Sequence, residues 1–188
     1  MPTLDDFREA GALLEGHFRL SSGLHSDRYL QCARFLMWPA RAEEAGRELA
    51  ARLAEFSPEV IVSPALGGVV IGHEVARALG VRAVFAERKD GAFQLRRGFS
   101  IGRDERVAVV EDVFTTGGST REVCEAVAAA GGRVVAVGSI VDRGASKDAF
   151  PAPARSVISL PIPAWPPDEC PLCAKGVAVE TPGSRHPG

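Results

Sequence analysis

No stretch of this 188-residue chain is apolar for long enough to cross a membrane, since a spanning helix needs about 20 consecutive apolar residues. The first residues, MPTLDDFREAGALLEG, place two acids early and contain no apolar core of the kind that a secretion signal has. The formal net charge is only −2, so no overall basic field favours a nucleic-acid partner. The sequence therefore predicts a cytoplasmic protein that binds neither a membrane nor nucleic acid.

Cysteine and lysine are both scarce. The chain has 4 cysteines, and a cytoplasmic protein of this length does not need a disulfide framework to fold. Only three of the 22 basic residues are lysines, so a lysine inside a motif stands out, and Lys89 is one of them.

Apolar segments alternate with helix-like patterns along most of the chain. We expect helices over residues 4–14 and 39–53, a helix that stops at Gly80, and a helix within STREVCEAVAAAGG. The expected strands are EVIV, VRAVFA, Val107–Val110, RVVAVGSIV and RSVISLPI. Buried strands that alternate with helices favour a parallel sheet covered on both faces, in which ligands bind at the carboxyl ends of the strands. One edge of the sheet should therefore hold the turns after Val62, Ala86, Val110 and Val141.

The segment VVEDVFTTGGSTREV, residues 109–123, carries the strongest chemical signal. Glu111 and Asp112 follow the expected strand, and a Thr/Gly/Ser turn leads into a helix that Ser119 would cap together with Glu122. The amides at a helix N-terminus bind phosphate, and glycines let the backbone close around it. The turn matches neither G-x-x-x-x-G-K-[ST] nor G-x-G-x-x-G. A monophosphate beside two carboxylates fits a ribose 5-phosphate, whose 2- and 3-hydroxyls can donate hydrogen bonds to the acids.

A plainer interpretation is that the two acids are surface residues and the turn only caps a helix. The full string, however, closely resembles the phosphoribosyl pyrophosphate (PRPP) motif of type I phosphoribosyltransferases: four apolar residues, two acids, two residues and a Thr/Gly turn. That resemblance implies an α/β fold, with a parallel sheet, helices on both faces and a small hood. A single domain would span residues 1–188, with residues 41–160 as the core and residues 1–40 and 161–188 as the hood and tail.

Three further segments resemble orotate phosphoribosyltransferases. Residues 18–32 (FRLSSGLHSDRYLQC) resemble their orotate-binding segment, residues 85–91 (FAERKDG) the Arg-Lys pair at the base of a mobile loop, and residues 139–144 (SIVDRG) the segment whose Arg binds the orotate carboxylate. The tail, CPLCAKG and then PGSR, looks like that of a short bacterial subgroup. This resemblance implies transfer of ribose 5-phosphate from PRPP to orotate, giving orotidine 5-phosphate and pyrophosphate in pyrimidine biosynthesis.

The resemblance also assigns roles to residues. PRPP would be bound by Arg88, Lys89, Glu111, Asp112, Val113, Phe114, Thr115, Thr116, Gly117, Gly118 and Ser119. Orotate would be bound by Arg143, which pairs with its carboxylate, and by Thr115, Tyr29, Ser22 and Gly23. Catalysis would depend on Lys89, Arg88, Glu111 and Asp112. Magnesium would be held mainly by PRPP, without dedicated protein ligands, and a homodimer would share its active sites across the interface.

The sequence departs from that family pattern in places. Many members have a lysine where this chain has Ser21, and another in the pyrophosphate turn SPALGG, where this chain has Gly67. The usual loop lysine and histidine are missing from DGAFQLRRGFSIG, so Arg96 and Arg97 are candidates for the lost charge in a lid over residues 89–102, and His25 is a candidate for contacting orotate. The same segment also reads as an ordinary β-hairpin.

Other interpretations stay open. A purine-base phosphoribosyltransferase would share the fold, although a purine has no carboxylate to pair with Arg143. A regulator that binds PRPP without turnover is a second alternative. The CxxC at Cys170 and Cys173 is either a tail turn with two reduced thiols or half of a zinc site completed by distant residues, and neither His17 nor His73 has a partner suggested by spacing.

Overall fold

The computed structural model describes residues 1–20, 22–145 and 147–182. Its largest element is a six-stranded sheet with the order β5-β4-β3-β6-β7-β8. These strands are β3 (Val60–Pro64), β4 (Arg82–Lys89), β5 (Ala92–Leu95), β6 (Arg106–Phe114), β7 (Arg133–Asp142) and β8 (Ala154–Ser159). Every neighbouring pair is parallel except β4 and β5, which form an antiparallel hairpin at one edge. The predicted parallel α/β architecture is confirmed.

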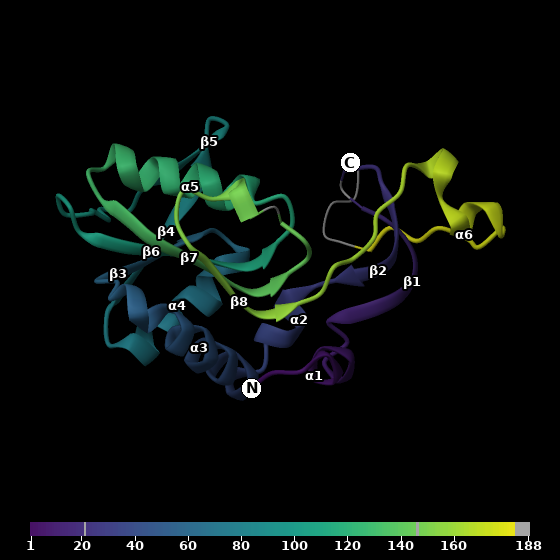
Figure 1. Ribbon diagram of the computed structural model, residues 1–188, viewed down its shortest axis with the longest axis horizontal. Coiled ribbons are helices and arrows are strands. Elements are labelled where there is room, and N and C mark those ends of the chain that lie inside the picture. Colours follow the sequence, from purple (N-terminus) through teal and green to yellow (C-terminus); the bar gives the residue numbers. More distant parts are fainter. Residues whose placement is uncertain (21, 146, 183–188) are drawn as a thin grey trace.

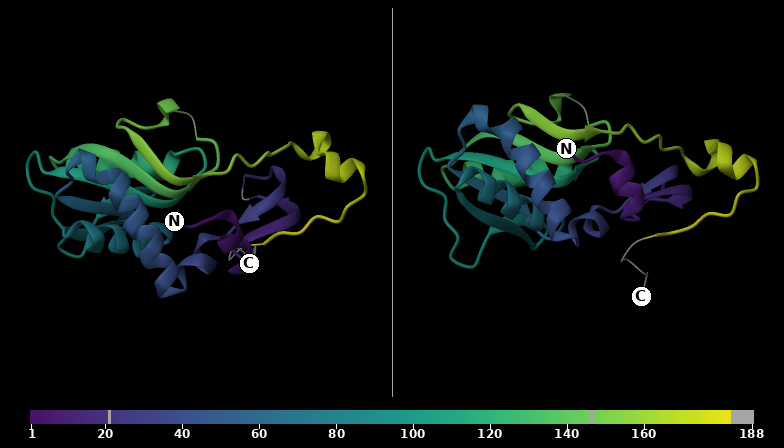
Figure 2. Two further views of the ribbon diagram at one scale, coloured as in Figure 1. Left: turned by 60° about the horizontal axis from the view of Figure 1, so that its bottom comes forward. Right: turned by 90° about the horizontal axis from the view of Figure 1, so that it is seen from below.

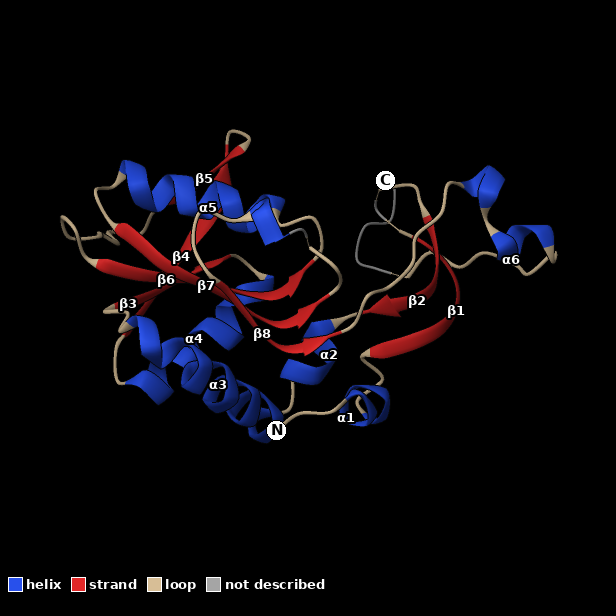
Figure 3. Cartoon of the chain, viewed as in Figure 1, coloured by secondary structure: helices blue, strands red, loops and turns tan. Residues whose placement is uncertain are grey.

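Helices cover both faces of this sheet (Figures 1 and 3). On one face lie α3 (Pro39–Leu53) and α4 (Gly67–Leu79), and on the other lies α5 (Gly118–Ala129). Successive strand residues point to opposite faces, so Ile61 packs into the core under α3 and α4, while Val60 and Val62 pack against the α5 side. Both faces of the sheet are therefore buried, as expected for a parallel sheet.

A second, two-stranded sheet lies beside the main one (Figure 2). It consists of β1 (Leu13–Arg19) and β2 (His25–Leu30), preceded by α1 (Leu4–Glu9) and followed by α2 (Cys32–Leu36). The C-terminal tail, with η3 (Pro167–Glu169) and α6 (Pro171–Ala174), returns to this hairpin. Two bridges hold it there, between Phe18 and Glu180 and between His25 and Trp165. We call β1, β2 and residues 161–182 the hood.

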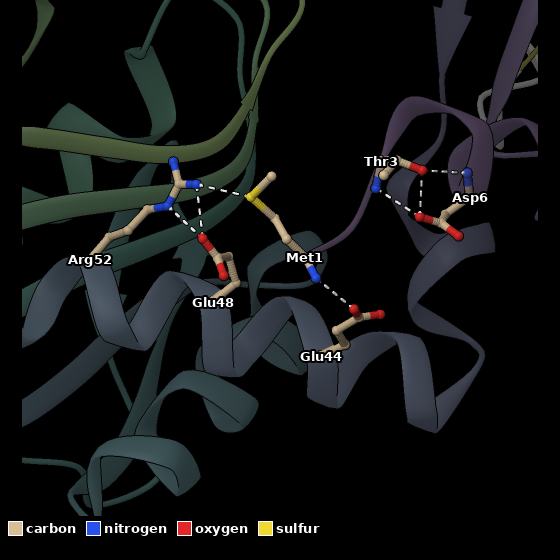
Figure 4. A network of polar contacts seen from close by, with 6 residues as sticks. All are labelled: Met1, Thr3, Asp6, Glu44, Glu48 and Arg52. Atoms are coloured by element: carbon tan, nitrogen blue, oxygen red, sulfur yellow. Dashed lines mark hydrogen bonds and ion pairs between the residues drawn. The ribbon is translucent and has the colours of Figure 1, made fainter.

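Polar contacts fix the start of the chain (Figure 4). Thr3 caps α1 through a reciprocal hydrogen-bond pair with Asp6, and the terminal amine of Met1 donates to Glu44 Oε1 at 2.8 Å. Glu48 and Arg52, one turn apart on α3, are joined by hydrogen bonds of 2.9 and 3.1 Å. The N-terminal segment is thus tied to α3, which carries the main core.

Several boundaries differ from the predictions. The predicted helix over residues 4–14 ends at Glu9, because Gly11 adopts φ 62° and the chain then enters β1. By contrast, the helix at Pro39–Leu53 and the stop at Gly80, with φ 71°, are confirmed. Two further short turns are helical, η1 (Ala54–Phe56) and η2 (Lys147–Ala149). Among the described residues, no helix is both long and apolar enough to cross a bilayer.

Candidate functional site

The two acids of the central motif lie within strand β6, not after it as predicted. The strand continues to Phe114 because β7 pairs alongside it as far as the Phe114–Asp142 position. Strand alternation then sends the two carboxylates to opposite faces of the sheet. Glu111 accepts a hydrogen bond from Thr120 Oγ1 of α5 at 3.0 Å, while the Asp112 carboxylate lies against the start of α4, beside Gly67. A ligand that crosses the end of β6 can therefore contact both acids.

Burial leaves these acids poorly solvated. It raises the pKa of Glu111 to about 8, and the nearby negative charge of Asp112 adds to this effect. Burial also raises the pKa of Asp112, although its own neighbouring amide, Val113 N–H, donates to Oδ1 at 2.8 Å and opposes the shift. No ion pair between described residues involves either carboxylate. Two partly buried acids without an ion-pair partner are costly for the free protein and indicate a binding site.

The turn after β6 leads into α5 at a glycine. Gly117 has φ 78° and takes the N-cap position, so the predicted cap at Ser119 is wrong. A side chain at Gly117 would also collide with the Phe150 ring, which is 2.7 Å from the position of a Cβ. Thr115, Thr116 and Ser119 are exposed, and the first amides of a helix of 12 residues open beside them. Hydroxyls and free amides at the positive end of a helix dipole suit a phosphate.

Arg143 lies at the same edge of the sheet as the two acids. It directly follows β7, and its amide donates to the carbonyl of Phe114 at 2.9 Å. Its guanidinium is partly buried, and its Nε has no hydrogen-bond partner among the described residues. Burial lowers the pKa of Arg143, and interactions with Cys32 and Tyr29 oppose that shift. An unpartnered Arg nitrogen in a buried position fits a planar anion such as a carboxylate.

The turn after β3 completes the site at the carboxyl edge of the parallel strands. Ala65 N–H donates to the carbonyl of Ala86 at 2.8 Å, and the following residues start α4. A Cβ on Gly67 would lie 3.1 Å from the oxygens of Asp112, so a longer side chain would require that carboxylate to move. The turns after β3, β4, β6 and β7 all lie at the carboxyl edge of parallel strands, which confirms that sequence prediction.

The basic pair lies at the end of β4, where the β4–β5 hairpin begins. Arg88 forms an ion pair with Glu122 of α5 at 2.9 Å and lies over the Phe93 ring at 4.4 Å from its centroid. Lys89 is exposed. The structure has a hairpin here, but it pairs β4 with β5 and ends at Leu95, so residues 96–102 are not part of it, and motion of this segment as a lid stays a prediction. Arg97 instead binds Glu87 through hydrogen bonds of 2.8 and 2.9 Å.

Some predicted site residues have no described contact with the acids. Ser22 and Gly23 occupy the turn of the β1–β2 hairpin, where Gly23 donates to the Leu20 carbonyl at 2.9 Å. Ser21 lies outside the described residues. Phe114 is buried against Phe150, with ring centroids 4.5 Å apart, so only its backbone faces the site. Arg96 is an exposed hairpin residue.

Two residues at the site were not predicted from the sequence. Thr120 is buried and donates a hydrogen bond to Glu111. It could have been predicted from its position in the first turn of α5, directly after the turn at residues 115–119, which we call the cradle. The Sγ of Cys32 lies 3.9 Å from the Asp112 carbonyl. Burial and then the charge of Asp112 raise the pKa of the Cys32 thiol well above its usual range, so this residue is a neutral wall of the site.

Comparison with known proteins agrees with this geometry. The profile of the phosphoribosyl transferase domain matches residues 33–170. A protein from Heliobacterium modesticaldum named orotate phosphoribosyltransferase is 51% identical over 184 residues, which is 97% of this chain and 96% of that protein. One of the same name from Thermotoga maritima is 50% identical over 177 residues, 94% of this chain and 95% of that protein.

Among solved structures, the orotate phosphoribosyltransferase of Mycobacterium tuberculosis H37Rv in complex with inorganic phosphate superposes with a TM-score of 0.67. It is 26% identical, and the match covers 84% of this chain and 97% of that one. The fold is thus the type I phosphoribosyltransferase fold. Profile, relatives and architecture agree, and the chain belongs to the phosphoribosyltransferase family.

Proposed function

We propose that the protein is an orotate phosphoribosyltransferase, which transfers the ribose 5-phosphate group of PRPP to orotate. The products are orotidine 5-phosphate and pyrophosphate, so the enzyme acts in pyrimidine biosynthesis. Nearly full-length relatives of about half identity carry that name. The observation that favours orotate over a purine base is Arg143, a partly buried cation with an unpartnered Nε that lies near Cys32 and Tyr29. Orotate has a carboxylate for this cation, and a purine base has none.

The reaction needs charge stabilisation more than a nucleophilic side chain. A ring nitrogen of orotate forms a bond to the anomeric carbon of the ribose while the bond to pyrophosphate breaks, and the bonding electrons leave with pyrophosphate. Positive charge develops on the ribose and negative charge on the leaving group. Placement of the reactants and fixed charges at those positions therefore supply most of the catalysis.

The ribose 5-phosphate would lie across the end of β6. Glu111 and Asp112 accept hydrogen bonds from the ribose hydroxyls, one from each face of the strand. Thr115, Thr116, Gly117, Gly118 and Ser119 hold the phosphate through hydroxyls and helix amides. The free acids and the open N-terminus of α5 support these roles. Val113 contributes through its backbone, because its amide already orients Asp112.

Orotate would bind between this cradle and the hood. Arg143 pairs with its carboxylate, and Thr115 approaches from the turn before α5. Tyr29 lies close enough to Arg143 to raise the pKa of the guanidinium. Ser22 and Gly23, at the hairpin turn, would close the pocket from the hood. This arrangement places the base next to Cys32, whose uncharged thiol does not repel the orotate anion.

Arg88 and Lys89 would bind pyrophosphate, and both are the proposed catalytic cations. In the free chain Arg88 is ion-paired with Glu122. PRPP must therefore either displace that carboxylate or be bound by the Arg88–Lys89 pair of a second subunit. We propose a homodimer with shared sites. Large exposed apolar side chains at Met37, Trp38, Leu66 and Val70 support such an interface, because they lie at the ends of α2, α3 and α4, which pack together.

Magnesium would be held mainly by PRPP, without dedicated protein ligands, because Glu111 and Asp112 accept hydrogen bonds from the ribose hydroxyls. Phosphate oxygens are the hard ligands that Mg²⁺ prefers. Bound in this way, Mg²⁺ would neutralise charge on the departing pyrophosphate. We place the enzyme in the cytoplasm, where its four free thiols would stay reduced.

The test is a parallel substrate assay. Purified protein is mixed with PRPP, Mg²⁺ and either orotate, uracil, adenine or hypoxanthine, and base consumption is followed by absorbance. Magnesium-dependent loss of orotate, with much slower use of uracil, supports the proposal, because uracil is orotate without its carboxylate. Turnover of a purine instead would assign the purine-base activity, and tight PRPP binding without any turnover would assign a regulator.

A further inference from the structure

Four potential metal ligands from distant parts of the chain meet in the hood. They are His17 of β1, His25 at the start of β2, Cys170 before α6 and Cys173 within it. Their ligand atoms all lie within 4.8 Å of one another. Cys170 and His17 are separated by 153 residues, so the fold and not local sequence brings them together. They are the only such group of three or more ligand residues in the described part of the chain.

The distances between these atoms match a tetrahedral zinc site. With Zn–N of about 2.0 Å and Zn–S of about 2.3 Å, a tetrahedron has N–N edges of about 3.3 Å and N–S edges of about 3.5 Å. His17 Nε2 lies 2.9 Å from His25 Nδ1. The sulfur of Cys170 is 3.5 Å from His17 Nε2, and that of Cys173 is 3.7 Å from the same atom and 3.2 Å from His25 Nδ1. These four of the six edges are within about half an ångström of the expected values, and the other two are no longer than 4.8 Å.

A second contact orients His17 for metal binding. Its Nδ1 lies 2.8 Å from the Val177 carbonyl, which can only accept a hydrogen bond. The Nδ1 proton therefore points to that oxygen, and the lone pair of Nε2 faces the two sulfurs. A ring nitrogen fixed in this way by a backbone carbonyl is the usual outer contact of a zinc-bound histidine.

The backbone positions the other ligands. The register between β1 and β2 slips by one residue between Glu15 and Phe18, which leaves His17 in an irregular segment and turns its side chain toward the tail. The cysteines sit on a tight turn, in which Ala174 donates to the Cys170 carbonyl and Gly176 to that of Cys173. Three of the four ligands, His17, His25 and Cys170, are at least 90% buried, whereas Cys173 is exposed.

We propose that these four residues bind one zinc ion in a closed Cys2His2 site, separate from the phosphoribosyl site. Two imidazoles and two thiols select zinc over magnesium or calcium, which prefer oxygen ligands. With all four positions filled by protein, the ion is structural and carries out no chemistry. It would join the C-terminal tail to the β1–β2 hairpin. An isolated two-stranded hairpin is only marginally stable, so this one gains from such a crosslink.

Metal analysis of the full-length protein tests the proposal directly. We expect about one zinc ion per chain after growth with zinc and purification under reducing conditions without chelators. X-ray absorption should show two sulfur ligands at about 2.3 Å and two nitrogen ligands at about 2.0 Å. The proposal is overturned if zinc is below a tenth per chain and the reduced apoprotein takes up none in competition with a chelator dye. Bound zinc with only nitrogen and oxygen ligands would overturn it too.

Matched variants distinguish this site from adventitious binding. Cys173→Ser changes an exposed side chain, so the rest of the fold should persist, and it should lower the zinc affinity of the purified protein at least tenfold. His73→Ala, which removes an exposed histidine of α4, should leave zinc content unchanged. Chelation should lower the melting temperature of the wild type and have a smaller effect on Cys173→Ser. Equal zinc affinity in both variants, or equal responses to chelation, would contradict the assignment.

Discussion

Replacement of Glu111 by glutamine should make the protein more stable at pH 8 while it loses activity. The variant has nearly the same shape and can still accept a hydrogen bond from Thr120, but it carries no charge. In the folded wild type, burial first, and then the charge of Asp112, raises the pKa of Glu111 to about 8 from an ordinary value of 4.5. Folding therefore opposes ionisation of this carboxyl group across that pH range.

The sign and size of the stability difference between wild type and variant follow from proton linkage. Between pH 4.5 and 8 the unfolded chain has lost the Glu111 proton and the folded chain still holds it, so stability falls as pH rises. The shift of roughly 3.5 pH units sets a ceiling of about 5 kcal/mol, at 1.36 kcal/mol per unit. Because the side chain is partly solvent-accessible, we expect about 1 to 3 kcal/mol. Wild type and variant should thus converge near pH 4.5 and differ most above pH 8.

Urea unfolding of both proteins at a series of pH values measures this difference. The variant should show the smaller fall in unfolding free energy from pH 5 to pH 8.5. Its kcat/KM for PRPP should fall at least tenfold, because one ribose contact is weakened. Parallel stability curves, or a variant that is less stable than wild type at pH 8.5, would refute the assigned titration. Unchanged kinetics would refute the binding role.

Other substitutions probe the remaining parts of the structure. Asp112→Asn should raise the KM for PRPP about tenfold or more in steady-state assays without changing the circular dichroism spectrum, and an unaltered KM would remove that carboxylate from the site. Arg143→Lys should raise the KM for orotate about tenfold or more and leave that for PRPP nearly unchanged, whereas Arg133→Lys, at the other end of β7, should do neither. Gly46→Ala should lower the melting temperature by about 2 to 10 °C, since its Cβ would lie 2.5 Å from that of Glu74, and equal melting temperatures would contradict this packing.

Much of the geometry of the candidate site could be predicted from the sequence, because its parts are close together along the chain. The strand, the two acids and the cradle occupy one short run, and parallel topology brings the turns after β3, β6 and β7 to the same edge. The cap at Ser119 was predicted wrongly because Gly117 can adopt positive φ and start the helix earlier. The strand end was also misplaced, since pairing with β7 extends β6 through the polar residues.

The contacts within the hood could not be predicted from the sequence, although the resemblance implied that a hood exists. His17 had no suggested partner, and His25 was a candidate for contacting orotate, yet both lie against the cysteines of the tail. No hydrophobic periodicity encodes a contact between residues some 150 positions apart. Such a contact depends on the path of an irregular tail. Likewise, Arg97 was expected to provide charge in the lid, and its pairing with Glu87 depends on the register of the β4–β5 hairpin.

The contacts between β1 and the C-terminal tail in the hood also affect the order in which the parts of the protein fold during synthesis. Strand β1 is synthesised before the strands of the main sheet, whereas Glu180, which pairs with Phe18 of β1, and the two tail cysteines are synthesised after β8. The six strands of the main sheet can pair before then, since β8 ends at Ser159. The contacts between the β1–β2 hairpin and the tail must wait until the tail has been synthesised, because contacts of high sequence separation form only when both segments are available. A chain that ends after β8 would thus contain all six strands of the main sheet but lack the tail contacts of the hood.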